Sequence, residues 1–255
     1  MGQLEGKTAL ILGASTRAGI GEATASRFIA EGARVIVTAR RRPELESLAA
    51  SIGAVPMECD ITDEAQLEAL MKRAFELERR LDVLVIVAGA HAGAPVDQLT
   101  RDMLLATYEI NVVAAALAIK HAARVMDRGA SIIYVSSAAA SLSTFGVTAY
   151  ACTKAAGERL VEVAALEYAA KGVRVNTLQP GMLDTSMSRT ALERPGVRAA
   201  FERETPLGRL ATVTEVAAAA VWLASDACYT TGDRIRVAGG VHLRRHPMPD
   251  DFHND

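Results

Sequence analysis

Short apolar runs alternate along this chain with longer amphipathic stretches, and this alternation limits the possible folds more than any other feature. Strands that are buried on both sides read as continuous apolar runs, so the pattern is typical of a parallel sheet with helices on both faces. We therefore expect an α/β fold with a doubly wound, seven-stranded parallel sheet. Its strands are predicted at residues 8–12, 34–38, 55–59, 83–87, 131–135, 173–178 and 233–237.

The segments between these strands predict the covering helices. In the clearest one, apolar residues recur at helical spacing: Leu67, Leu70, Met71, Ala74, Leu77 and Leu81. Further helices are expected at residues 20–31, 101–122, 149–171 and 214–224. No linker or repeat divides the pattern, so we predict one domain over residues 1–255. We expect residues 182–205 to form a mobile substrate flap. Residues 242–255 are expected to form a polar tail, in which Pro247 and Pro249 disfavour a helix.

Composition disfavours several classes of function. The net charge of −2 leaves no basic surface for nucleic acid. The three cysteines are far apart and lack metal-ligand spacing, which indicates a reducing compartment without a disulfide framework. The N-terminus lacks the apolar stretch of a signal peptide, and no window approaches the roughly 18 uninterrupted apolar residues of a membrane span. We therefore expect a soluble, cytoplasmic protein with neither nucleic acid nor membrane as a partner.

A glycine-rich loop, with Gly13, Gly19 and Gly21, lies between the first predicted strand and the first predicted helix. Glycine there allows a sharp turn and close approach of the backbone to a pyrophosphate, which then rests on the N-terminus of the helix. Glycine also serves ordinary turns, but the position after a strand and before a helix favours dinucleotide binding.

The end of the second strand selects the dinucleotide. An acidic residue there would bind the ribose 2′-hydroxyl of NAD(H), whereas arginine accommodates the 2′-phosphate of NADP(H). Here the strand ends without an acid and is followed by Arg40, Arg41 and Arg42. Arginine recognises phosphate through a planar, permanently charged fork. A solvated basic turn is the alternative interpretation, but we predict NADP(H) as the cofactor rather than NAD(H).

Tyr150 and Lys154 are four residues apart, and Ser137 lies thirteen residues before the tyrosine. On a helix, positions i and i+4 share one face, with Cβ atoms about 5–6 Å apart. A lysine ammonium held there favours the phenolate and lowers the tyrosine pKa from its usual value of about 10. Such a pair on its own is a weak signal, because a surface contact on a helix has the same spacing.

The order of the motifs resembles that of the short-chain dehydrogenase/reductase family: Gly13, Gly19, Gly21, Asn111, Ser137, Tyr150, Lys154, Pro180, Gly181 and Thr185. The resemblance covers nearly the whole chain. It implies a Rossmann fold and hydride transfer between a nicotinamide and a carbonyl or alcohol carbon. It further implies that Tyr150 is the general acid/base, that Ser137 polarises the substrate oxygen, and that Lys154 binds the nicotinamide ribose and lowers the tyrosine pKa. Asn111 would interrupt its helix and hold a water that links Lys154 to solvent.

The same resemblance implies the residues that contact the cofactor. Asp60 and Ile61 match the adenine contact, Ala88 and Gly89 match the turn that lines the cofactor, and Thr185 matches the carboxamide contact. The full set is Gly13, Ser15, Thr16, Arg17, Gly19, Ile20, Arg40, Asp60, Ile61, Ala88, Gly89, Tyr150, Lys154, Pro180, Gly181 and Thr185.

Two features depart from the family pattern. Five residues separate Gly13 from Gly19, where the family usually has three, so that Ser15 stands at the expected position of the first glycine. A longer loop is also found in a divergent enoyl-reductase branch, but that branch spaces its Tyr and Lys differently, so we retain carbonyl chemistry. The second departure is Ile86 and Val87, where the family commonly has two asparagines.

The substrate side is expected to be apolar. We predict that Leu142, Phe145, Met182 and Met187 line it and accept a ketone or a secondary alcohol, although packing of the flap would use the same residues. His91 is a further candidate for a substrate contact, with a solvated loop histidine as the alternative.

Partners and rival functions follow from the rest of the chain. Three histidines near the C-terminus could suggest a metal site, but the prolines among them favour a disordered end: His242, His246 and His253. The resemblance implies a homotetramer or homodimer. An NAD-linked alcohol dehydrogenase and a non-catalytic dinucleotide sensor remain as alternative functions.

Overall fold

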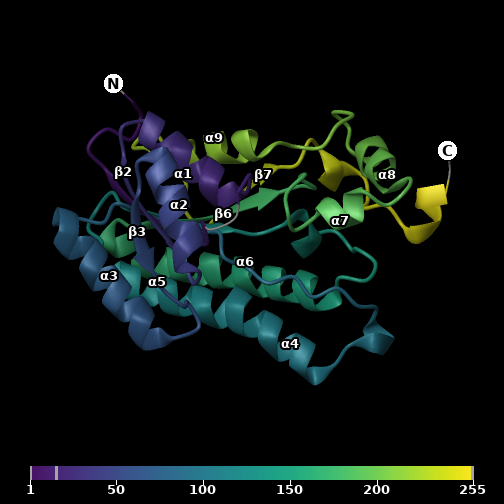
Figure 1. Cartoon of the computed structure of the whole chain (residues 1–255), viewed down its shortest axis with the longest axis horizontal. Coiled ribbons are helices and arrows are strands. Elements are labelled where there is room, and N and C mark those ends of the chain that lie inside the picture. Colours follow the sequence, from purple (N-terminus) through teal and green to yellow (C-terminus); the bar gives the residue numbers. More distant parts are fainter. Residues whose placement is uncertain (1, 15–16, 254–255) are drawn as a thin grey trace.

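The structure, a computed structural model, describes residues 2–14 and 17–253. Its centre is a seven-stranded sheet in the order β3-β2-β1-β4-β5-β6-β7, and every adjacent pair of strands is parallel (Figure 1). The predicted α/β, doubly wound fold is thereby confirmed. The strands are β1 Thr8–Leu12, β2 Arg34–Ala39, β3 Val55–Glu58, β4 Val83–Ile86, β5 Ser131–Val135, β6 Arg174–Pro180 and β7 Arg234–Val237.

Two layers of helices cover the sheet. One face packs against α1 Ile20–Ala30, α2 Arg42–Ile52 and α9 Val213–Ala224, and the other against α3 Glu64–Glu78, α5 Ala114–Val125 and α6 Thr148–Tyr168. The two layers lie above and below the strands in Figure 1. Helix α2 was not predicted from the sequence. It begins among charged residues and buries only Leu45, Leu48 and Ala49, so its apolar stripe is short.

The helix predicted at residues 101–122 is interrupted, as the family resemblance implied. It consists of α4 Arg101–Tyr108, a π-helical turn Glu109–Val113 and then α5. Single π-helical turns inside α-helices often mark functional sites. By length and composition alone, the stretch Arg101–Val125 could also cross a membrane, but helices that pack on a protein core meet the same criterion.

The segments expected to be a flap and a loose tail pack against each other. The flap contains α7 Arg189–Leu192 and α8 Val197–Glu204. Phe201 of α8 lies in a small apolar cluster that also takes in Met182 and Phe252. His246 is only 7% exposed, so the expectation of a disordered tail was wrong for residues 242–253. A 3-10 turn, Pro249–His253, forms there because proline is tolerated at the first position of a helical turn.

Candidate active site

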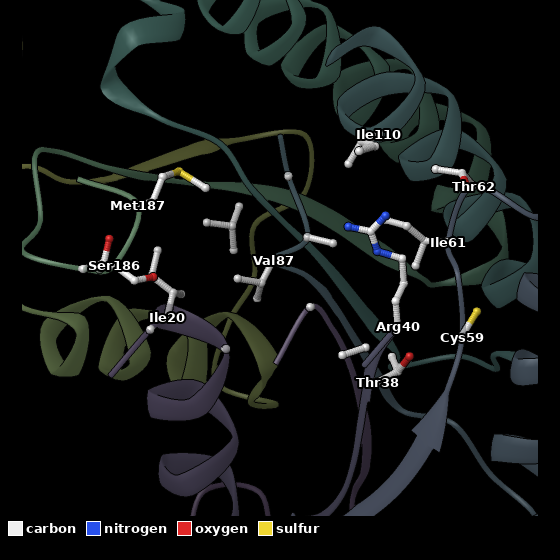
Figure 2. Close-up of a pocket in the computed structure, with 18 of the residues that line it drawn as sticks. Ile20, Thr38, Arg40, Cys59, Ile61, Thr62, Val87, Ile110, Ser186 and Met187 are labelled. Carbon is white, nitrogen blue, oxygen red and sulfur yellow. The ribbon is translucent and has the colours of Figure 1, made fainter. Parts of the chain in front are cut away.

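A cavity of about 640 Å³ lies beyond the carboxyl ends of the strands, where the order of the sheet reverses between β1 and β4. Ligands of open α/β sheets bind at such a switch point. Most of the predicted cofactor residues line the cavity, and Figure 2 shows several of them around it. The predicted residues that line it are Gly13, Gly19, Ile20, Arg40, Asp60, Ile61, Ala88, Gly89, Tyr150, Lys154 and Thr185.

The glycine-rich loop forms the floor of this cavity. Gly13 has a φ of 94°, and a Cβ added to it would lie 2.6 Å from the backbone nitrogen of Ala88. A side chain would therefore force apart the ends of β1 and β4. Gly19 is the N-cap of α1 and offers no side-chain cap, so the first N–H groups of the helix are left for another acceptor. Ser15 and Thr16, which were predicted to contact the phosphates, lie outside the described residues.

The four arginines near the loop have different surroundings. Arg41 pairs with Glu44 at 3.4 Å and Arg42 pairs with Glu46 at 2.8 Å, both along α2. Arg17 donates to Ser47 Oγ at 3.1 Å and does not line the cavity. Arg40 points its guanidinium into the cavity (Figure 2) and forms no ion pair with any of the described residues.

Asp60 is held in place at the end of β3. Its Oδ1 accepts hydrogen bonds from Thr62 N at 3.0 Å and from Thr62 Oγ1 at 2.8 Å. These hydrogen bonds lower the pKa of the Asp60 carboxyl, and the charge of Arg40 contributes less. The carboxylate is therefore ionised and oriented beside the cavity.

Tyr150, Ser137 and Lys154 come together at one wall of the site. Tyr150 and Lys154 lie on α6, and Ser137 follows the end of β5. Ser137 lies close enough to Tyr150 to lower the pKa of its phenol. Lys154 is 3% exposed; its Nζ donates to the Val135 carbonyl at 2.8 Å and lies 5.8 Å from the centre of the Tyr150 ring.

The electrostatics of this wall differ from the sequence-based expectation. Burial raises the pKa of Tyr150, and the nearby Ser137 hydroxyl opposes this shift only in part. Burial also lowers the pKa of Lys154 to about 8, opposed by the negative charge of Glu158. The predicted lowering of the Tyr150 pKa by Lys154 stays a prediction, because in this structure desolvation disfavours the charged forms of both groups.

Asn111 joins three parts of the site from within the π-helical turn. Its Oδ1 accepts from Ala90 N at 2.8 Å, and its Nδ2 donates to Ala90 O and to Thr153 Oγ1, each at 2.9 Å. Its backbone carbonyl accepts from the Tyr134 hydroxyl at 3.1 Å. The side chain thus ties the loop after β4 to α6. The bridging water that the resemblance assigns to Asn111 stays a prediction.

Comparison with known proteins agrees with this arrangement. The family model described as "Enoyl-(Acyl carrier protein) reductase" matches residues 13–242. The chain is 36% identical over 242 residues to cis-4-hydroxycyclohexanecarboxylate dehydrogenase of Sinomonas cyclohexanicum, covering 92% of this chain and 96% of that protein. It is 33% identical over 247 residues to a mitochondrial borneol dehydrogenase of Lavandula x intermedia, covering 94% and 92%.

A solved structure from Mycobacterium ulcerans, described as a short-chain type dehydrogenase/reductase, has a TM-score of 0.92 and 32% identity, covering 96% of this chain and 93% of that one. This chain belongs to the short-chain dehydrogenase/reductase family. The family's nicotinamide dinucleotide fits the residues present here, since a Cβ added at Gly13 would clash with Ala88, and the uncapped start of α1, which can bind an anion, lines the cavity.

The departures from the family pattern are accommodated locally. Val87 lines the cavity, and Ile86 is buried in the core. Their replacement of asparagine leaves the backbone contacts in place, because Val87 N and Ala88 N both donate to Leu12 O, at 2.9 and 2.8 Å. Part of the lengthened glycine loop is not described.

The predicted substrate residues divide into two groups. Phe145 and Met187 are each 58% exposed, and Met187 lines the cavity, where it can meet a ligand. Leu142 packs against the cluster of Ala138 and Val241, and Met182 against the flap cluster, so packing accounts for both. Pro180 ends β6 and Gly181 follows it, and neither lines the cavity.

His91, a further candidate for a substrate contact, lies beside Tyr150. Its ring centre lies 4.9 Å from that of Tyr150, with the planes tilted by 51°, although the side chain is exposed. Partial burial lowers the pKa of His91, which keeps the imidazole neutral at neutral pH. Sequence reasoning missed several lining residues that carry no motif, since side chains such as Ile110 and Ser186 become neighbours only in the fold.

Proposed function

We propose that this chain is an NADP(H)-dependent oxidoreductase that interconverts a ketone and a secondary alcohol, with Tyr150 as the general acid/base. The observation that carries the proposal is the grouping of Tyr150, Ser137 and the Lys154 ammonium at the wall of a cavity whose floor is the glycine-rich loop. Family membership supports the use of a nicotinamide cofactor.

In this mechanism the chain's own groups handle the proton and the substrate oxygen. A bound reduced nicotinamide would supply a hydride to the carbonyl carbon. Ser137 orients and polarises the carbonyl oxygen, and the Tyr150 hydroxyl donates its proton to that oxygen as the alcohol forms. Lys154 then stabilises the tyrosinate left behind. The raised pKa of Tyr150 keeps it protonated at neutral pH, which supports its use as an acid in the reductive direction.

The preference for NADP(H) is supported by Arg40, whose guanidinium points into the cavity free of the pairings that hold Arg41 and Arg42. A charged hydrogen bond to a 2′-phosphate is worth roughly 1.5–3 kcal/mol, or about 10- to 100-fold in affinity. Arg40→Asp should therefore weaken NADPH binding by that factor and bring NADH binding level with it or above it.

Arg42→Asp is the matched control, since it makes the same charge change two residues away on a side chain paired with Glu46. Its ratio of NADPH to NADH dissociation constants, followed by cofactor fluorescence, should stay within about threefold of that of the unaltered protein. An Arg40→Asp variant that keeps its NADPH preference would refute the assignment.

The substrate class is supported by the relatives. Two of them are named for cyclic secondary alcohols, and Phe145 and Met187 offer apolar surface beside the site. We therefore propose an apolar, cyclic ketone or alcohol. A panel of such compounds, followed by NADPH absorbance, tests the claim; no turnover of any member despite tight NADPH binding would favour the non-catalytic sensor.

Enoyl reduction is a second candidate, because the matching family model carries that description. The four-residue spacing of Tyr150 and Lys154 and the position of Ser137 beside Tyr150 favour carbonyl chemistry instead. Adding an α,β-unsaturated thioester to the same panel separates the two, since only an enoyl reductase would consume NADPH with it.

We further propose a cytoplasmic homotetramer or homodimer. The helices that the family uses for association carry exposed apolar side chains here: Leu104, Leu105 and Tyr108 on α4, and Leu166 on α6, which is 80% exposed. Light scattering during gel filtration would measure the mass; a monomer at working concentrations would contradict this assembly.

A further inference from the structure

A buried carboxylate lies on α6 one helical turn beyond Lys154. Glu158 is 3% exposed, and both of its oxygens are engaged. Its Oε1 accepts from Ser136 Oγ at 2.6 Å and from Gln179 Nε2 at 2.7 Å, and its Oε2 pairs with Arg234 Nε at 3.0 Å. Three chain segments beside the site, β5, β6 and β7, are therefore joined to α6 at one side chain.

Each hydrogen-bond partner of Glu158 is adjacent in sequence to a residue that was predicted to take part in the site. Ser136 directly precedes Ser137, the group expected to polarise the substrate oxygen. Gln179 directly precedes the Pro180–Gly181 turn, and its Nε2 also donates to Ser141 Oγ at 2.7 Å, in the loop after Ser137. Movement of the carboxylate would therefore shift Ser137 and the turn after β6 relative to Tyr150.

The charge of Glu158 also acts on Lys154. Burial lowers the pKa of Lys154 to about 8, and the Glu158 carboxylate opposes that shift. Among the described residues, the other titratable groups that face the ammonium are the phenols Tyr134 and Tyr150. The other charges on the network are Arg234, Arg236 and, beyond Arg234, Glu162. Glu158 thus supplies a negative charge near Lys154, whereas the two phenols beside the ammonium are neutral when protonated.

Stability alone gives little reason to bury this charge. Replacing buried ion pairs with apolar side chains of similar volume is often neutral or stabilising. A carboxylate that is fully hydrogen-bonded does, however, fix the relative positions of the groups it joins.

We propose that Glu158 is a positioning residue for this reaction: it holds Ser137 and the chain after β6 in place relative to Tyr150 and places a carboxylate one helical turn from Lys154. The inference rests on the proposed function, since it assigns those four groups to one active site.

Glu158→Gln tests the proposal, because it keeps the size of the side chain and removes its charge. We expect kcat to fall by about tenfold, which corresponds to about 1.4 kcal/mol of transition-state stabilisation. The alkaline limb of the pH–rate profile should move to lower pH, because Lys154 loses its proton earlier without the carboxylate. KM for the ketone should stay within about twofold.

Glu162→Gln is the matched control. Glu162 lies one further turn along α6 and bonds the same Arg234 at 2.8 Å, but its side chain is 31% exposed. Its variant should keep kcat within about twofold and leave the pH profile in place. Ser136→Ala separates position from charge: kcat should fall while the alkaline limb stays where it is.

A measurement without turnover keeps this test apart from that of the proposed function. The sequence has five lysines, so NMR of 15N-labelled lysine amino groups can follow Lys154 in the free protein. Glu158→Gln should lower the pKa of Lys154, and Glu162→Gln should not. If no ketone is turned over, the proposed function fails while this titration still reports on Glu158.

The proposal is overturned if Glu158→Gln matches Glu162→Gln in kcat, in pH profile and in the lysine titration. Should Glu158→Gln lose its cooperative thermal transition, Ser136→Ala decides the positioning role, and an unchanged kcat in that variant overturns it.

Discussion

Substituting Gly157 by alanine should destabilise the protein and impair catalysis together. A Cβ at this position would contact the Tyr134 hydroxyl and lie 2.6 Å from its Cζ and 2.8 Å from its Cε1. Tyr134 is fully buried and cannot move aside without losing the hydrogen bond from its hydroxyl to the Asn111 carbonyl, which measures 3.1 Å. The clash therefore reaches the π-helical turn and the ring beneath Lys154.

The magnitude follows from three opposing contributions. Overpacking of a filled core costs roughly 1–3 kcal/mol, and loss of a buried hydrogen bond adds roughly 1 kcal/mol. Alanine is a better helix former than glycine, which returns up to about 1 kcal/mol. The net loss is about 1–3 kcal/mol, or a fall in Tm of about 3–10 °C for a chain of this length.

Thermal unfolding with and without Tyr134→Phe forms a double-mutant cycle. Removing the hydroxyl relieves the closest of the three contacts, so Gly157→Ala should cost less in the Tyr134→Phe background, by about 0.5–1 kcal/mol. The kcat should fall in Gly157→Ala, because the Tyr134 ring centre lies 4.8 Å from Lys154 Nζ and moves with the hydroxyl. A Gly157→Ala protein as stable as the original would refute this account of α6 packing.

Two further predictions concern single side chains. Tyr150→Phe should lower kcat by about 10²- to 10⁴-fold while the dissociation constant of NADPH stays near normal, and retention of more than about a tenth of kcat would contradict the acid role. His246 is buried and its pKa falls from 6.5 to about 4, so the protein should lose about 3 kcal/mol of stability as pH falls through that range, because the unfolded chain takes up the proton first. His246→Gln should flatten this acid limb in urea unfolding, and an unchanged limb would place its origin elsewhere.

Much of the fold could be predicted because its strands are buried on both faces. Such strands appear as apolar runs, and the runs at residues 8–12 and 131–135 match β1 and β5 residue for residue. Helix α2 was not predicted because it buries only a narrow apolar stripe. The packing of the C-terminal tail was not predicted because it depends on a segment distant in sequence. Phe252 packs against the apolar cluster that contains Phe201, about fifty residues earlier in the chain, and no local sequence pattern predicts that contact.

Some features of the site could also be predicted from local sequence, and others could not. Spacing on one helix was enough to place Tyr150 and Lys154 together, and the position of the glycines was enough to place the cavity floor. The effect of burial on the Tyr150 pKa could not be predicted, because burial results from the whole fold rather than from a neighbour four residues away. The network around Glu158 was missed for the same reason, since it joins residues from α6, β6 and β7.

The charge state of Lys154 depends closely on its surroundings. Its ammonium is almost completely buried, and its one hydrogen bond to the described residues goes to the neutral Val135 carbonyl. The pKa of about 8 therefore lies close to neutral pH, so a modest change in nearby charge decides whether Lys154 is charged. On the proposed mechanism, a neutral Lys154 can no longer stabilise the Tyr150 tyrosinate. The negative charge of Glu158, one turn away, favours the protonated form of Lys154, and only that form supports proton transfer on this mechanism.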